Sequence, residues 1–227
     1  VELFSNDKTM EYYFKSNILN FNKLSDALSL LVSKNLKSQE INEENIIHDV
    51  GIAFTNKDII DAIEEDINEI YHKDPACNYL FQPLLFYKGF QALQAYRVAN
   101  YWAREKLGFS MYIQSIVSEK FNVDIHPSAE IGKGIMIDHA SGVVIGETAR
   151  VGDYCSIFHG VTLGGVGAEK GQRHPQVGKN VLLSANSTIV GNIKIGDNTK
   201  IGAGSVVLND IPKDCTAVGV PAKIINN

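Results

Sequence analysis

The chain has 227 residues and a formal net charge of −5, and 44% of its residues are hydrophobic. This apolar content is ample for a folded core, while no basic stripe suggests nucleic-acid binding and no apolar run approaches the roughly 18 residues of a membrane span. The three cysteines are far apart and form no C-x-x-C pair. We therefore expect a cytoplasmic protein without a disulfide framework.

Composition divides the chain into two parts. Sixteen of the 19 glycines lie at or after Gly132. Residues 1–120 carry a net charge of −5, whereas residues 121–227 hold nine acidic and nine basic side chains. We predict a helical domain over residues 1–122 and a repetitive domain over residues 123–227.

The first part shows helical spacing of apolar residues in three segments. One runs from residue 7 to about residue 35, and another follows Thr55 and Asp58, which resemble a capping box, and stops before Pro75. The third runs from about residue 89 to residue 107 and is closed by Gly108. Aromatic residues within 79–102 are expected to pack between helices or at an oligomer surface rather than to line a ligand site.

The second part repeats an aliphatic residue every sixth position. A period of six fits neither a helix nor a strand and is typical of a coil in which three short strands close one triangular turn. About four coils are expected, each rising by about 4.8 Å, the spacing of paired strands. The general rule for parallel crossovers favours a right-handed coil. The repeating residues are Ile125, Ile131, Ile137 and Val143, then Ile145, Val151, Ile157 and Leu163, and finally Val177, Leu183, Ile189, Ile195, Ile201 and Val207.

The repeat is interrupted between Leu163 and Val177, where 14 residues replace the expected six. A solenoid accepts an insertion at a corner, and such insertions commonly build the binding face. The predicted loop over residues 164–176 carries Arg173 and His174 side by side. It is either a solvated loop or part of a binding site.

His139 lies among small residues just before the first shift in register. It is either a surface residue or a base that faces a cleft. Asp124 precedes it by 15 residues, close to one 18-residue coil, so its carboxylate could orient the imidazole. An Asp–His pair of this kind can activate a hydroxyl group.

Metal binding is the rival explanation for the histidines. His126, His139, His159 and His174 are separated by 13, 20 and 15 residues. None of them forms the closely spaced pair that is typical of a zinc site. We therefore expect no metal.

Several motifs together resemble the serine O-acetyltransferase family of hexapeptide-repeat acyltransferases. They are KDPA at 73–76, KGFQALQAYR at 88–97, VDIHP at 123–127, GIMIDHA at 134–140, VIGET at 144–148, VTLGG at 161–165, RHP at 173–175 and GVPAK at 219–223. The resemblance covers about residues 70–223. It implies an α+β fold, in which a helical substrate and oligomerisation domain precedes a left-handed parallel β-helix acyltransferase domain with an inserted loop.

The same resemblance implies the reaction and the residues that carry it. Acetyl would pass from acetyl-CoA to the hydroxyl of L-serine, giving O-acetyl-L-serine and CoA for cysteine synthesis. His139 would be the general base, oriented by Asp124. The serine-binding positions would be Asp74, Asp138, Glu147, Arg173 and His174, and the CoA-binding positions would be Gly165, Ala185, Lys200 and Ala203.

The resemblance also implies partners. The site would lie between subunits of a homotrimer or of a dimer of trimers, and L-cysteine would act as a feedback inhibitor. The family's tail that binds O-acetylserine sulfhydrylase extends past Asn227, so that partner is only weakly expected. Two alternatives remain: an acetyltransferase for another small hydroxyl acceptor, which would not need Asp74 and Arg173, and a non-catalytic scaffold, which would not need His139.

Overall fold

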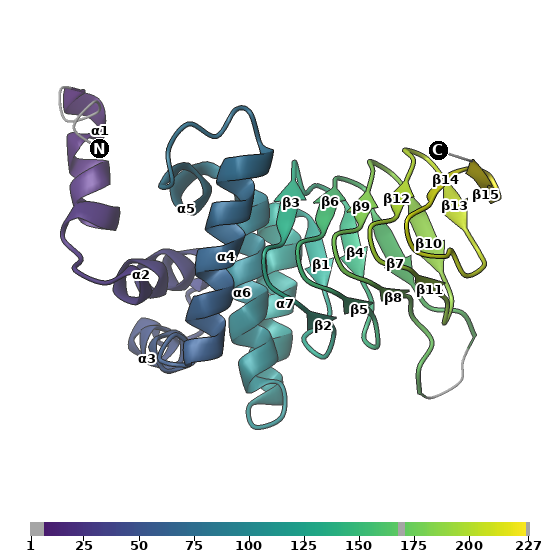
Figure 1. The fold of residues 1–227 in the computed structure, drawn as a ribbon. Helices are drawn as coiled ribbons and strands as arrows, with labels where there is room; N and C mark the ends of the chain where they lie inside the picture. The colour runs from purple at the N-terminus through teal and green to yellow at the C-terminus, as the bar shows by residue number, and fades with distance from the viewer. Residues whose placement is uncertain (1–6, 168–170, 226–227) are drawn as a thin grey trace. The chain divides into compact units, whose positions relative to one another are not determined.

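The computed structural model describes residues 7–167 and 171–225 of the chain. Within these residues, helices occupy the first half and short strands the second (Figure 1). The chain divides into two compact units, Val1–Ile60 and Asp61–Asn227. The helices are α1 (Lys8–Phe14), the π-helical turn η2 (Lys15–Leu19), α2 (Leu24–Leu36), α3 (Glu43–Ala53), α4 (Lys57–Lys73), α5 (Gln82–Phe86), α6 (Lys88–Trp102) and α7 (Leu107–Phe121).

The first unit packs α2 against α3 around buried aliphatic side chains, Leu28, Leu36, Ile46 and Val50 among them. The prediction of continuous helical structure over residues 7–35 was wrong between Leu19 and Leu24. Lys23 takes an extended backbone there, with φ −127° and ψ 141°, so α2 has to begin anew. No helix in the part of the chain that the structure describes is long and apolar enough to cross a membrane.

Two predicted helix ends are shifted in the structure. Asn56, rather than Thr55, caps α4, because its side-chain oxygen accepts hydrogen bonds from the amides of Asp58 and Ile59 at 2.9 and 3.3 Å. Gly108 does not close α6, which ends at Trp102; it lies inside α7. The predicted stop of α4 before Pro75 is confirmed.

The second half of the chain is a left-handed parallel β-helix with three sheets along its faces (Figure 1). The predicted repeat is confirmed, since every repeating aliphatic side chain is buried except the half-buried Ile131. Sheet A contains β1 (Val123–Ile125), β4 (Val143–Ile145), β7 (Thr162–Gly164), β10 (Thr188–Val190) and β13 (Val206–Val207). Sheet B contains β2 (Glu130–Ile131), β5 (Arg150–Val151), β8 (Gln176–Val177) and β11 (Lys194–Ile195). Sheet C contains β3 (Met136–Asp138), β6 (Ser156–Phe158), β9 (Leu182–Leu183), β12 (Lys200–Ile201), β14 (Thr216–Gly219) and β15 (Ala222–Ile225).

The β-helix has about five turns rather than the roughly four that we predicted from the repeat. The last turn lies outside the hexad spacing, because Lys200 pairs with Thr216, only sixteen positions later. Strand β15 then folds back antiparallel on β14. Hydrogen bonding between strands therefore continues after the six-residue spacing has ended.

A buried ion pair attaches the helices of the second unit to the first coil. The Asp66 side chain is fully buried and its Oδ2 lies 2.7 Å from Nη2 of Arg97, which is 7% exposed. Asp66 Oδ1 also accepts a hydrogen bond from the amide of Ile135 at 2.8 Å, and Arg97 donates to the carbonyl of Gly132 at 2.9 Å. Because a buried charge without a partner is costly, this network holds α4 and α6 against the coil and so sets the positions of the residues at their ends.

Candidate active site

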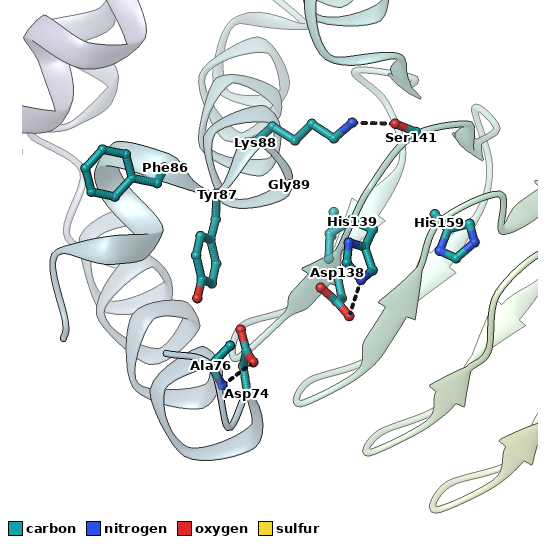
Figure 2. A pocket seen from close by; sticks show the side chains of 11 residues that line it. Asp74, Ala76, Phe86, Tyr87, Lys88, Gly89, Asp138, His139, Ser141 and His159 are labelled. Carbon is teal, nitrogen blue, oxygen red and sulfur yellow. Dashed lines mark hydrogen bonds and ion pairs between the residues drawn. The ribbon is translucent and has the colours of Figure 1, made fainter. Parts of the chain in front are cut away.

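A cavity of about 890 Å³ lies where the end of α4 and the start of α6 meet the corner between β3 and β4. Figure 2 shows carboxylates, imidazoles and a lysine around it. Three predicted site residues, Asp74, Asp138 and His139, therefore come together. The lining residues are Asp74, Ala76, Phe86, Tyr87, Lys88, Gly89, Ile137, Asp138, His139, Ser141 and His159.

The corner that carries His139 is two residues longer than the same corner one coil further on. Met136 and Val144 are eight positions apart, whereas their strand partners Ser156 and Thr162 are six apart. The longer corner has left-handed backbone at both His139 and Ala140, with φ of 55° and 58°. Such angles are uncommon for residues with a side chain and cluster at functional sites.

The His139 imidazole lies beside Asp138 at the mouth of the cavity and is 74% exposed (Figure 2). Its Nε2 is 3.8 Å from Oδ2 of Asp138, which is too long for a hydrogen bond. The ring of His159 lies edge-on with a centroid separation of 5.8 Å. His139 is therefore open to a ligand.

Asp74 follows the last turn of α4. Its Oδ1 accepts a hydrogen bond from the amide of Ala76 at 2.8 Å. The hydroxyl of Tyr87 points toward Asp74 (Figure 2), and burial, followed by hydrogen bonding to this carboxylate, raises the pKa of Tyr87. Tyr87 thus stays protonated and donates to Asp74, so the carboxylate is held in place.

Glycine at position 89 permits α6 to approach the coil. A Cβ atom there would overlap the carbonyl oxygen of Ile137, so no other residue fits without movement of the backbone. The approach brings Tyr87 and Lys88 into the cavity, and Lys88 Nζ donates to Ser141 Oγ. Sequence reasoning assigned no role to these residues, or to His159, because only the fold reveals their proximity.

A second cluster of predicted residues occupies the corner between sheets A and B. Nη2 of Arg173 lies 2.5 Å from Oε2 of Glu147, and this hydrogen bond holds the pKa of Glu147 below its usual range. Gln172 Nε2 donates to the carbonyls of Thr148 and His174 at 2.7 and 2.8 Å. The inserted loop is confirmed, since Thr162 pairs with Thr188, 26 positions away; its residues 168–170 lie outside the described residues.

His174 is the buried member of this cluster, only 7% exposed. Its Nδ1 accepts a hydrogen bond from the amide of Thr148 at 3.2 Å and lies 2.9 Å from the hydroxyl of the same residue. That hydroxyl oxygen accepts from the amides of Arg173 and His174, so its own proton is available for Nδ1. Burial, followed by the charge of Arg173, lowers the pKa of His174. The ring is therefore neutral, with its proton on Nε2, and acts as a donor.

The two groups of residues lie at different corners of the same coil. His139 follows sheet C and precedes sheet A, whereas Glu147 follows sheet A and precedes sheet B, as do Arg173 and His174. One chain therefore does not bring the second cluster to the cavity. Gly165 lies with this second cluster, and a Cβ atom on it would be 2.9 Å from Nε2 of His174.

The remaining predicted CoA-binding residues lie further along the β-helix. Ala185 and Ala203 occupy the same corner as His159 in the following two coils, joined by hydrogen bonds from Asn186 to the His159 carbonyl and from Gly204 to the Ala185 carbonyl, both 2.9 Å. Lys200 is exposed on β12 of sheet C. These positions form a continuous track that leads away from the cavity.

Asp124 is separate from the cavity. Its Oδ1 accepts a hydrogen bond from Gln114 Nε2 at 2.7 Å, and no hydrogen bond joins it to His139 within the described residues. The predicted orienting role of Asp124 therefore remains a prediction. Among the described side chains, no group of three or more His, Cys, Asp or Glu residues is placed to hold a metal ion.

Two family models match the chain. One is described as "Serine acetyltransferase, N-terminal" and matches residues 1–95, and the other is described as "Bacterial transferase hexapeptide (six repeats)" and matches residues 174–209. The first lies in the helical half and the second in the β-helix. The matches therefore agree with the order of the two halves in the structure.

Three solved structures are similar to the chain over nearly its whole length. The structure titled as a serine acetyltransferase complex with cysteine is 43% identical, with a TM-score of 0.96, and 99% of this chain covers 88% of that one. A Neisseria gonorrhoeae serine acetyltransferase in complex with serine is 41% identical, with a TM-score of 0.93 and coverages of 96% and 90%. A Brucella abortus serine acetyltransferase in complex with coenzyme A is 38% identical, with a TM-score of 0.95 and coverages of 99% and 90%. The chain therefore belongs to the serine acetyltransferase family of acyltransferases.

Proposed function

We propose that the chain transfers the acetyl group of acetyl-CoA to the hydroxyl of L-serine, giving O-acetyl-L-serine and CoA, as the first step of cysteine biosynthesis. The observation that carries this proposal is the convergence of Asp74, Asp138 and His139 on one cavity. The serine-bound and coenzyme A-bound relatives support the choice of acceptor and donor.

The cavity suits the ammonium group of an amino acid. Asp74 is fixed by Ala76 and Tyr87, and Asp138 lies on the opposite wall, so two carboxylates can receive one cation. The carboxylate of serine would need a donor of the opposite charge. Arg173, whose guanidinium is oriented by Glu147, and the neutral Nε2–H of His174 are suited to this task.

His139 acts as the general base in this mechanism. A serine hydroxyl is a poor nucleophile near neutral pH, and an exposed imidazole can take its proton as the oxygen attacks the thioester carbonyl. The resulting tetrahedral oxyanion would accept hydrogen bonds from backbone amides of the glycine-rich loop that starts at Gly164 and Gly165. The intermediate then collapses, the carbon–sulfur bond breaks, and the imidazolium returns its proton to the CoA thiolate.

Acetyl-CoA would lie along the track that leads from the cavity. The small side chains of Ala185 and Ala203 leave room for the pantetheine arm. Lys200 is an exposed cation on the adjacent face, suited to a phosphate of CoA. No acyl-enzyme is needed, because both substrates meet beside one base.

A second copy of the chain would complete the site. The cavity and the Arg173 cluster lie at different corners, so a ring of three copies in which one corner faces the next would unite them. This arrangement supports a homotrimer, or two trimers joined through their helical domains. L-cysteine shares the ammonium and carboxylate of serine, so it would compete for the same pocket, in line with the cysteine complex of a relative. The O-acetylserine sulfhydrylase partner and the cytoplasmic location remain predictions.

Release of the CoA thiol, measured with L-serine, homoserine and a galactoside as separate acceptors, tests the proposal. We expect release with L-serine well above that with the other two acceptors. Preference for the galactoside would point to the alternative acetyltransferase, and no release with any acceptor would point to a scaffold. Calorimetric titration with L-cysteine, with and without serine, tests the shared pocket in the same samples.

A further inference from the structure

The His139 side chain is held in place by little besides its own backbone. It is 74% exposed, and its neighbours Asp138 and His159 make no hydrogen bond to it in the described part of the chain. The direction of the imidazole therefore depends on the corner formed by residues 139–142. Any movement of this corner would move the base.

This corner adopts an unfavourable backbone conformation. His139 and Ala140 have φ of 55° and 58°, and Gly142 has φ of 79°. Two successive residues with side chains in left-handed conformation persist only where the surroundings hold them there. Backbone hydrogen bonds from Gly142 to the Asn122 carbonyl, at 2.7 Å, and from Gly160 to the Ser141 carbonyl, at 2.9 Å, fix one end of the corner.

Lys88 provides a contact from the helices. Its ammonium group donates to the hydroxyl of Ser141, and the next residue, Gly89, abuts the carbonyl of Ile137 just before the corner (Figure 2). Lysine is the first residue of α6, whose first turn has no acidic residue and no side-chain cap. A cation is unfavourable at the positive end of a helix, so helix stability does not explain its presence.

We propose that Lys88 is a positioning residue for His139. Through Ser141 it holds the left-handed corner and so keeps the imidazole directed into the cavity. The carboxylates of Asp74 and Asp138, which line the same cavity, offset the charge of the lysine at the helix start. Lys88 acts through the corner and not on the reacting atoms. The inference rests on the proposed role of His139 as the base.

The kinetic test compares Lys88→Met, Lys88→Arg and Ser141→Ala with the unmodified chain. Lys133→Met is the matched control, because Lys133 also joins a helix to the first coil, through Glu65 at 3.8 Å, and does not line the cavity. A small misplacement of a catalytic group is costly, so we expect Lys88→Met to lower kcat roughly ten- to hundredfold. Its KM for serine should stay within about threefold. Arginine, which can still donate to Ser141, should restore most of kcat, and the control should change little.

The double variant Lys88→Met/Ser141→Ala separates a shared contact from two independent effects. If the two residues act together, the double variant should be no slower than the slower single variant. Multiplied losses would overturn the proposal. So would a raised KM for serine at unchanged kcat, because Lys88 would then bind the substrate directly.

Nuclear magnetic resonance of ring-labelled histidine supplies a readout that does not depend on activity. The His139 signal is identified by its loss in His139→Gln. We expect this signal to shift or broaden in both Lys88→Met and Ser141→Ala while the His174 signal stays unchanged. An unchanged His139 signal in both variants would refute the positioning role even if the chain acetylates serine, whereas a chain that does not acetylate serine would refute the proposed function alone.

Discussion

Two corners of one β-helix hold their histidines in opposite ways. His139 is 74% exposed on a left-handed corner that has few side-chain contacts. His174 is 7% exposed, packs against glycines and has its Nδ1 bound by Thr148. The first arrangement leaves both ring nitrogens free to exchange protons, and the second fixes a neutral donor. Exposure and hydrogen bonding thus separate a base from a binding group more clearly than residue type does.

Replacing His139 by Ala should have the largest effect. A positioned general base contributes roughly 10²- to 10⁴-fold, so kcat should fall by at least that lower factor, while calorimetric binding of acetyl-CoA should change little. His48→Ala, an exposed histidine on α3, is the control. An unaltered rate in His139→Ala would assign the base elsewhere and remove the contrast between the two corners.

Mixing two inactive variants tests whether the corners act together across copies. His139→Ala lacks the base and Arg173→Ala lacks the carboxylate donor, so each alone should be nearly inactive. In a randomly mixed ring, roughly one site in four would combine an intact His139 from one copy with an intact Arg173 from the next. Co-expression with two different tags should therefore recover about a quarter of the activity. Recovery no greater than that of either variant alone would contradict a site shared between copies.

Gly146→Ala should disturb only the buried corner. A Cβ atom on Gly146 would overlap the ring of His174, whereas one on the nearby Gly164 would meet nothing closer than 3.6 Å. Displacement of His174 removes a hydrogen bond to a charged group, about 1.5–3 kcal/mol, so KM for serine should rise roughly ten- to hundredfold. The comparison is with Gly164→Ala under the same conditions. Equal KM values in the two variants would show that His174 does not bind the substrate.

The smallest expected effect is a pH dependence of stability. Because the pKa of folded His174 lies below 6.5, the unfolded chain binds more protons as the pH falls below 6.5, and folding stability decreases there. His174→Gln keeps an acceptor and a donor but does not titrate. Denaturant unfolding at fixed protein concentration should show a steeper loss of stability below pH 6.5 in the unmodified chain than in the variant. Parallel pH profiles would mean that His174 is not held neutral.

Hydrophobic periodicity predicted the β-helix well, because the buried face of each short strand admits one aliphatic side chain per six residues. It did not predict the last turn, which strand pairing continues at a different spacing through Thr216. Helix ends were predicted less well, since a cap depends on a single hydrogen bond, as the shift from Thr55 to Asn56 shows. Periodicity also left open the hand of the coil, which followed from family resemblance.

Among the site residues, Asp74, Asp138 and His139 were foreseen through motifs that resemble a known family, and the structure brings them together. Tyr87, Lys88 and Ser141 carry no motif-level signal of a shared role. Their contacts depend on how α6 meets the coil at Gly89. A contact between residues that are 53 positions apart cannot be read from spacing.

By itself, the sequence determined the two-part organisation, the six-residue repeat, the inserted loop and the family. These features depend on local composition and on short-range spacing, which a linear chain displays directly. Only the tertiary structure decided which residues surround the cavity and that Arg173 and His174 lie at another corner. The physical reason is that burial, left-handed backbone and charge pairing arise where distant segments meet, and these three properties distinguish His139 from His174.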